Sequence, residues 1–137
     1  MTQYILDACA LIAFLKDEEG ADKVTAILHD ANKRVAVVSM NTINLLEVYY
    51  DIYRGVGKEK ASEELALIKK LPIAIKTEIA EGVFLEAGRL KASYRISLAD
   101  SLALAETSFS GGELITADHH EFDTIERQEK LRFCWIR

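Results

Sequence analysis

Short apolar runs alternate with longer helical patterns along the whole chain, and this alternation restricts the fold more than any other feature. The run VAVVS at residues 35–39 is continuous and rich in β-branched residues, which is typical of a parallel strand covered on both faces. Parallel strands need long crossover connections, and helices usually provide them. The alternation therefore predicts an α/β fold with three layers, in which helices cover both faces of a parallel sheet of about four to five strands.

The individual elements follow from the same patterns. Strands are expected at residues 3–6, 35–39, 73–75, 113–116 and 131–136. Helices are expected at residues 8–16, 21–31, 41–54, 58–70, 77–92, 99–109 and 119–128. Thr77 is the expected N-cap of its helix, because a threonine hydroxyl can accept a hydrogen bond from a free N–H of the first turn. No linker or repeat interrupts the 137 residues, so a single domain is expected.

Composition and charge exclude several classes of protein. With 28% charged and 50% hydrophobic residues, the chain has an ordinary soluble composition, and its two cysteines, Cys9 and Cys134, are too few for a disulfide framework or a cysteine-based zinc site. They fit reduced thiols in a cytoplasm. The apolar stretch 4–15 is short and contains Asp7, so neither a signal peptide nor a membrane span is expected. The net charge of −5 argues against binding of nucleic acid by bulk charge, but a bound metal ion could supply positive charge locally.

Four acidic residues occupy special places in this pattern. Asp7 directly follows the first expected strand, and Asp118 lies two residues beyond the strand at 113–116. Asp100 falls in the first turn of its helix. In open parallel sheets, ligands bind in the crevice at the carboxyl ends of the strands. Asp7 and Asp118 are therefore expected at this edge, and Asp100 can reach it if its helix begins there.

Each of these three acids also has a purely structural interpretation. Asp7 could serve only as the N-cap of the helix that follows it. Asp100 stands three residues after Ser97, as in a capping box, and an acid in the first turn suits the positive end of a helix. Asp118 could be a turn residue. The positions alone leave both interpretations open.

The fourth acid, Glu47, is harder to explain by structure alone. It lies in the segment INLLEVYY and shares a helical stripe with Ile43 and Tyr50. A charge on a mostly apolar stripe needs a partner, and Arg54 is two turns away, too far for a standard pair on one helix. We therefore expect Glu47 to find its partner outside its own helix.

Together the four carboxylates imply a cation. Two carboxylates about 5 Å apart repel each other by about 3 kcal/mol at an effective dielectric constant of about 20. Either some of them are protonated or a cation lies among them. No histidine or cysteine accompanies them at ligand spacing, so the ligands are all oxygens, which favours Mg²⁺ or Mn²⁺ and phosphoryl-transfer chemistry.

Four segments resemble, in the same order, those of PIN-domain ribonucleases, specifically the VapC-like toxins of bacterial or archaeal toxin–antitoxin pairs. They are YILDACALIAFL at 4–15, NTINLLEVYY at 41–50, ISLADSLALAET at 96–107 and LITADHHEFD at 114–123. The resemblance implies one PIN domain over residues 1–137. It also implies that Asp7, Glu47, Asp100 and Asp118 are the catalytic, metal-binding acids and that Thr116 is the hydroxyl residue that orients the site. Cys9 stands where many members have serine, which affects a contact behind the metal ligands.

The resemblance further implies the activity and the partners. The activity is that of an endoribonuclease that uses Mg²⁺ or Mn²⁺ to hydrolyse tRNA or mRNA in the cytoplasm. The partners are a small cognate antitoxin that covers the active site and a second copy of the chain, in a homodimer or larger assembly; no membrane is involved. Residues that contact RNA are not assigned; the basic candidates are Lys16, Arg54, Lys58, Lys60, Arg89, Lys91 and Arg95. His119, Glu121 and Asp123 are further candidates at the edge of the site.

Other functions require residues at specific positions. A receiver-like Mg²⁺-binding signalling domain would need an acidic pair after the first strand and a lysine late in the chain, but Asp7 stands alone. A haloacid-dehalogenase-type phosphatase would need aspartate at the place of Cys9. A PIN domain kept only to bind RNA is the remaining alternative, and the complete set of four acids argues against a loss of activity.

Overall fold

The computed structural model describes residues 1–137, and its five strands form one sheet in the order β3-β2-β1-β4-β5. The strands are β1 (Thr2–Leu6), β2 (Ala36–Asn41), β3 (Ala74–Lys76), β4 (Glu113–Thr116) and β5 (Arg132–Trp135). Every neighbouring pair is parallel. The prediction of a three-layer α/β fold around a parallel sheet is confirmed.

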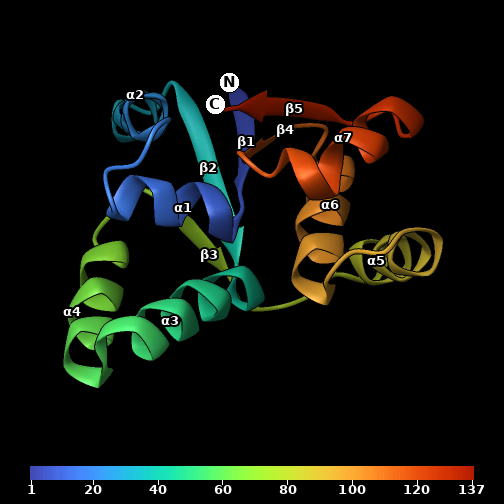
Figure 1. Ribbon diagram of the computed structural model, residues 1–137. Coiled ribbons are helices and arrows are strands. Elements are labelled where there is room, and N and C mark those ends of the chain that lie inside the picture. Colours follow the sequence, from blue (N-terminus) through green and yellow to red (C-terminus); the bar gives the residue numbers. More distant parts are fainter.

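Seven helices connect the strands and cover both faces of the sheet (Figure 1). They are α1 (Ala8–Leu15), α2 (Ala21–Asn32), α3 (Thr42–Val56), α4 (Lys58–Ile68), α5 (Glu81–Ser93), α6 (Leu98–Ser110) and α7 (His119–Gln128). The chain runs from β1 through β2 to β3 in one direction and then returns past β1 to β4 and β5. Since β-α-β crossovers are almost always right-handed, this reversal places α5–α7 on the face opposite α1–α4. None of the helices is long and apolar enough to cross a membrane.

Alternating strand residues divide the core into two halves. Leu6 and Ile115 pack on the side of α1–α4, whereas their neighbours Ile5 and Leu114 pack on the side of α5–α7. This is the period of two that a strand imposes on its side chains. Both faces of the central strands are therefore apolar, and polar groups at this sheet are concentrated where the strands end.

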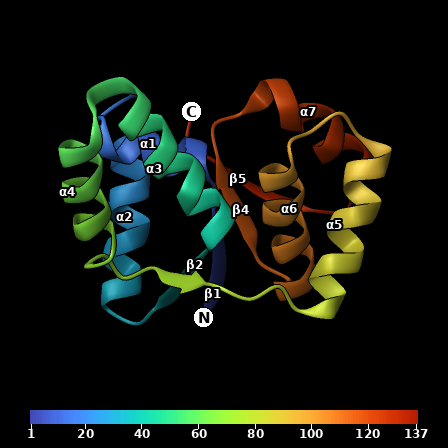
Figure 2. The ribbon, with the colours of Figure 1, turned by 90° about the horizontal axis from the view of Figure 1, so that it is seen from below.

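The connection between β3 and α5 differs from the prediction. The helix expected from residue 77 begins at Glu81, its N-cap position is occupied by Ala80, and Thr77 lies outside it, so the predicted threonine cap is wrong. Figure 2 shows why: the chain must cross beneath the sheet from the side of α4 to the side of α5. An extended connection covers this span, and a local capping preference cannot override it.

The turn between α6 and β4 fits the prediction and brings two strands together. Gly111 ends α6 in a left-handed conformation with a φ of 68°, which glycine adopts without strain. A Cβ on the next residue, Gly112, would collide with the backbone carbonyl of Gln3. The absence of a side chain at this position lets β4 enter the sheet directly beside β1.

Candidate active site

The reversal in the order of the strands places two of the predicted acids side by side in the fold. Asp7 follows β1 and Asp118 follows β4, which are neighbours in the sheet. The N–H of Asp7 donates to the carbonyl of Ile115 at 3.3 Å, so the sheet holds the Asp7 backbone beside β4. In an open α/β sheet, such a reversal point is where ligands bind.

Asp7 caps a helix, and its buried environment disfavours the ionised form of its carboxyl group. Its Oδ1 accepts a hydrogen bond from the N–H of Ala10 at 2.8 Å, so it caps α1 as the structural interpretation requires. Its residue is only 2% exposed. Burial raises the pKa of Asp7 to about 7 although hydrogen bonds from Thr116 and Ala10 lower it, and the charges of Asp100 and Asp118 add to the rise. A residue selected only to cap a helix would not need this environment.

Asp100 reaches the same place from the first turn of α6. Here Ser97 is the N-cap, and its Oγ accepts from the N–H of Asp100 at 3.0 Å. Burial is the largest cause that raises the pKa of Asp100 to about 6, and the charges of Glu47, Asp118 and Glu121 contribute as well. The carboxyl of Asp100 therefore lies near acids from two other parts of the chain, α3 and the start of α7.

Asp118 caps α7 and is linked to Thr116. Its Oδ1 accepts from the N–H of Glu121 at 3.1 Å, and its own N–H donates to Thr116 Oγ1 at 3.1 Å. Thr116 is fully buried, and its hydroxyl also lowers the pKa of Asp7. Thr116 thus lies between the two acids that follow β1 and β4, where an orienting hydroxyl is expected.

Glu47 is exposed, although the apolar residues on its helical stripe argued against a place at the surface. The buried stripe of α3 consists instead of Asn44, Leu45, Val48 and Ile52, and Tyr50 on the other stripe is 55% exposed. Aromatic residues are often partly exposed, so the positions of the apolar residues alone did not identify the buried face of α3. Partial burial nevertheless raises the pKa of Glu47, and Asp118 and Asp51 add to the rise.

The four acids therefore approach one another from four different elements, but they do not form a closed cage. No group of three or more His, Cys, Asp or Glu side chains is arranged to hold a metal ion. One oxygen each of Asp7 and Asp118 is used to cap a helix. Mg²⁺ usually keeps several waters and needs only one or two carboxylates, so this all-oxygen set fits a hard divalent cation.

A family model for the PIN domain matches residues 4–128. The chain belongs to the PIN-domain family. No curated protein matches it.

Solved structures with the same fold include VapC-type toxins. VapBC of Salmonella typhimurium, bound to DNA, aligns with a TM-score of 0.73 and 14% identity over all of both chains. A toxin–antitoxin complex from Klebsiella pneumoniae aligns with a TM-score of 0.66 and 16% identity over 98% of both chains. VapC20 of Mycobacterium tuberculosis, a toxin that cleaves the sarcin-ricin loop, aligns with a TM-score of 0.55 and 14% identity. The alignment covers 81% of this chain and 86% of VapC20.

A groove of about 430 Å³ lies between α1 and α3 of this PIN domain, and Glu47 is the one acid of the candidate site that lines it. Its lining includes Cys9 and Lys16 on one side and Glu47, Tyr50 and Arg54 on the other. The Asp51 carboxylate forms ion pairs with both cations. Its oxygens lie 3.4 Å from Lys16 Nζ and 3.1 Å from a guanidinium nitrogen of Arg54. The same guanidinium lies 5.0 Å from the centre of the exposed Tyr50 ring. Cations and an aromatic face thus stand next to the acidic site.

Cys9 lines this groove from the first turn of α1. Burial raises the pKa of the Cys9 thiol to about 11, and the charge of Asp7 adds to the rise. Without a bound metal the thiol is therefore neutral near pH 7.

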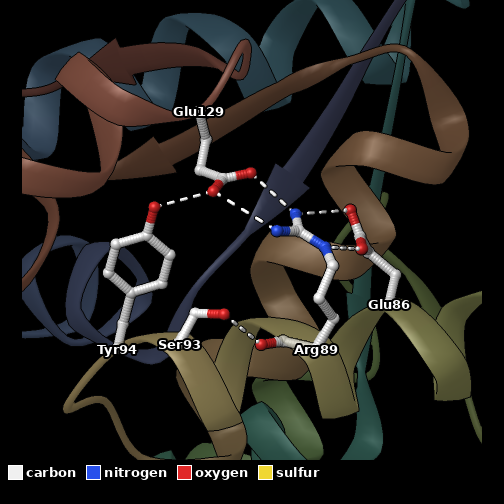
Figure 3. A network of polar contacts seen from close by, with 5 residues as sticks. All are labelled: Glu86, Arg89, Ser93, Tyr94 and Glu129. Carbon is white, nitrogen blue, oxygen red and sulfur yellow. Dashed lines mark hydrogen bonds and ion pairs between the residues drawn. The ribbon is translucent and has the colours of Figure 1, made fainter.

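Two of the other basic candidates, Arg89 and Lys60, are engaged in ion pairs elsewhere in the PIN domain. Arg89 on α5 donates to Glu86 at 2.6 Å and to Glu129, beyond α7, at 2.7 Å, while the Tyr94 hydroxyl donates to Glu129 at 2.7 Å (Figure 3). This network fastens α5 to the segment after α7, and few of its donors remain for a phosphate. Lys60 pairs with Glu64 at 3.0 Å.

His119 does not join a metal site with His120. Its Nδ1 lies 2.8 Å from Asp123, its Nε2 lies 2.8 Å from the Arg137 carbonyl, and its ring stacks on Trp135 at 3.8 Å. His119 and Asp123 therefore hold the end of the chain. Glu121, by contrast, is close enough to the site to raise the pKa of Asp100, after burial and two other acids.

Two residues near the acids were not identified from the sequence. Asn41 and Asn44 are buried amides between β2 and α3. Asn41 has a recognisable signal, since asparagine before an apolar helix is a favoured N-cap. Asn44 has none, because its role depends on a contact with Ala99, 55 positions away.

Proposed function

We propose that this PIN domain is a metal-dependent endoribonuclease and the toxin of a toxin–antitoxin pair. The observation that carries the proposal is the convergence of Asp7, Glu47, Asp100 and Asp118 at the reversal point of the sheet, where burial and mutual repulsion raise the pKa of three of them. The solved toxin structures that share the fold, among them a toxin that cleaves the sarcin-ricin loop, support the same activity.

In this proposal Asp7, Asp100 and Asp118 hold Mg²⁺ or Mn²⁺ directly, and Glu47 holds it directly or through water. A divalent cation in this place lowers the pKa of a water molecule and offsets the charge that builds up on the phosphate oxygens. Thr116 keeps Asp7 and Asp118 in position through its hydroxyl. Glu47, at the exposed edge, accepts a hydrogen bond from the attacking water and orients it.

The reaction is hydrolysis of an RNA phosphodiester, with tRNA or mRNA as the substrate. The water oxygen forms a bond to phosphorus in line with the bridging ribose oxygen whose bond breaks, and that oxygen leaves with a proton. The 2′-hydroxyl is not the nucleophile, so preference for RNA arises from contacts in the groove. Lys16 and Arg54 contact phosphates there, and Tyr50 offers a face on which a base can stack.

The partners follow from the same proposal. A small antitoxin covers the acidic site and blocks cleavage, as the toxin–antitoxin complexes of similar fold suggest. The toxin assembles as a homodimer or larger oligomer and acts in the cytoplasm, where its RNA targets are.

Cleavage of end-labelled tRNA and mRNA pools in Mg²⁺, Mn²⁺ or EDTA, with Asp100→Asn in parallel, tests the activity. We expect cuts that need the metal and that Asp100→Asn abolishes while its circular dichroism spectrum stays unchanged. If Asp100→Asn still cuts with metal, the assigned site is wrong. If the unsubstituted protein binds metal but cuts neither pool, a role in binding RNA replaces the nuclease.

A further inference from the structure

Two buried asparagines connect three of the elements around the acidic site. Asn41 is the last residue of β2 and Asn44 lies in the first turn of α3. They are 5% and 1% exposed, so both amides lie inside the protein. Buried amides are uncommon and require hydrogen-bond partners, which makes the partners of these two informative.

Their hydrogen bonds run from the end of the sheet to the first turn of α6. Asn41 Oδ1 accepts from the N–H of Asn44 at 2.8 Å and so caps α3. Asn44 Nδ2 in turn donates to the carbonyl of Ala99 at 3.1 Å. Ala99 directly precedes Asp100, so the last bond ends at the backbone that carries this acid.

Asn44 also stands one helical turn before Glu47. Residues three positions apart are neighbours on a helix surface, so the position of Asn44 on the buried side of α3 determines where the exposed Glu47 emerges. Glu47 and Asp100 carry like charges, and the charge of Glu47 contributes, after burial, to the raised pKa of Asp100. Without a tie between α3 and α6, this repulsion favours a wider separation.

Each amide has one buried atom without a partner in the protein. Asn41 Nδ2 and Asn44 Oδ1 make no hydrogen bond to another protein group. A partly unsatisfied buried amide is destabilising, and an apolar side chain of similar shape would avoid the penalty. The bonds that the pair does make, the cap of α3 and the bond to the Ala99 carbonyl, are what an apolar side chain could not supply.

We propose that Asn44, held by Asn41, is a positioning residue whose hydrogen bond to the Ala99 carbonyl sets the separation of the Glu47 and Asp100 carboxylates. This inference rests on the proposed metal-dependent nuclease, because the separation matters for a shared cation. Groups behind the ligands of a metal commonly change metal affinity about 10- to 100-fold when they are removed. Asn44 touches neither the cation nor the RNA in this arrangement.

The test replaces Asn44 with leucine, which has a similar size but cannot donate. Thr107→Val is the matched control. The buried Thr107 Oγ1 donates to the Ala103 carbonyl at 2.8 Å within α6, the helix that also carries Ala99 and Asp100, but away from the first turn of that helix. The full chain is titrated with Mn²⁺ by calorimetry without RNA. We expect Asn44→Leu to weaken Mn²⁺ binding about tenfold and to lower kcat, with KM for RNA changed less than about twofold. Thr107→Val keeps the affinity of the unsubstituted protein.

A second pair of variants covers the case in which Asn44→Leu does not fold. Asn41→Ser keeps an oxygen that can cap α3 and is expected to retain Mn²⁺ affinity, whereas Asn41→Leu loses the cap and is expected to weaken it. Unchanged Mn²⁺ affinity in both leucine variants overturns the positioning role and leaves the nuclease intact. Equal losses in Thr107→Val overturn it too, because they indicate a general loosening of α6. No Mn²⁺ binding by the unsubstituted protein overturns the metal site itself, and the positioning role with it.

Discussion

At the scale of single residues, the acids of the site combine a local structural role with an unfavourable environment. Asp7 stabilises α1 as a cap, but its ionised form is destabilised by burial and by two neighbouring acids. The helix cap that the structural interpretation predicts is thus confirmed, and the functional interpretation of Asp7 stays a prediction. A buried carboxylate that is hard to ionise near neutral pH is a common mark of a functional site.

Replacing Asp7 with asparagine is expected to stabilise the metal-free protein at pH 8. The pKa of Asp7 in the folded protein, about 7, lies above its ordinary value of 3.8, so its stabilising contribution is complete below pH 3.8 and is lost as the pH rises through 7. The difference corresponds to at most about 4 kcal/mol, and since asparagine keeps the cap but must also be buried, we expect a gain of about 2 kcal/mol. Urea unfolding in EDTA measures it.

The pH dependence distinguishes this cause from a change in packing. The advantage of Asp7→Asn is expected to shrink between pH 8 and pH 4, while Asp30→Asn, at an exposed position of α2, has little effect at either pH. A gain that is the same at both pH values would contradict the ionisation argument.

At the scale of elements, the alternating pattern predicted every strand and helix, because each element is long or apolar enough to show its own period. What it could not predict depends on distant parts of the chain. The start of α5 is set by the crossing beneath the sheet, and the exposed side of α3 by which of its faces meets the core. The places of Asp7 and Asp118 at the carboxyl ends of neighbouring strands were predictable, because Asp7 directly follows β1 and Asp118 lies two residues beyond β4. The contact of Asn44 was not, because its partner is 55 positions away.

The groove between α1 and α3 is expected to bind RNA through its two cations. Helix geometry places Arg54 about 10 Å along α3 from Glu47, a distance over which the strand flanking the cut can pass. The double variant Lys16→Gln, Arg54→Gln is expected to raise KM for RNA about tenfold with little change in kcat. The salt dependence of RNA binding is expected to fall as well. The slope of the logarithm of the binding constant against the logarithm of the salt concentration becomes smaller in magnitude by about 1.4 when two phosphate contacts on a single strand are lost.

The matched control for the groove is Lys91→Gln, Arg95→Gln. It removes the same charge from exposed positions on and just after α5 that do not line the groove. Both double variants should bind Mn²⁺ as the unsubstituted protein does. Equal increases in KM would mean that net charge alone, rather than this groove, determines RNA binding.

At the scale of the whole molecule, the fold brings like charges together, so a bound cation is expected to stabilise it. A ligand that binds only the folded state stabilises it by about 2.7 kcal/mol at 100 times its Kd. For a chain of 137 residues this corresponds to a rise in Tm of about 9 °C, so Mn²⁺ in excess is expected to raise Tm by about this amount at pH 8. Because metals bind ionised carboxylates, the rise in Tm should fall away as the pH drops through the pKa values of Asp7 and Asp100, about 7 and 6.

Thermal unfolding at pH 8 and pH 5, with Mn²⁺ or EDTA, measures this coupling between metal and pH, and Asp100→Asn should lose most of the rise. An equal rise in Tm at pH 5, or in Asp100→Asn, would show that Mn²⁺ acts somewhere other than at these four acids.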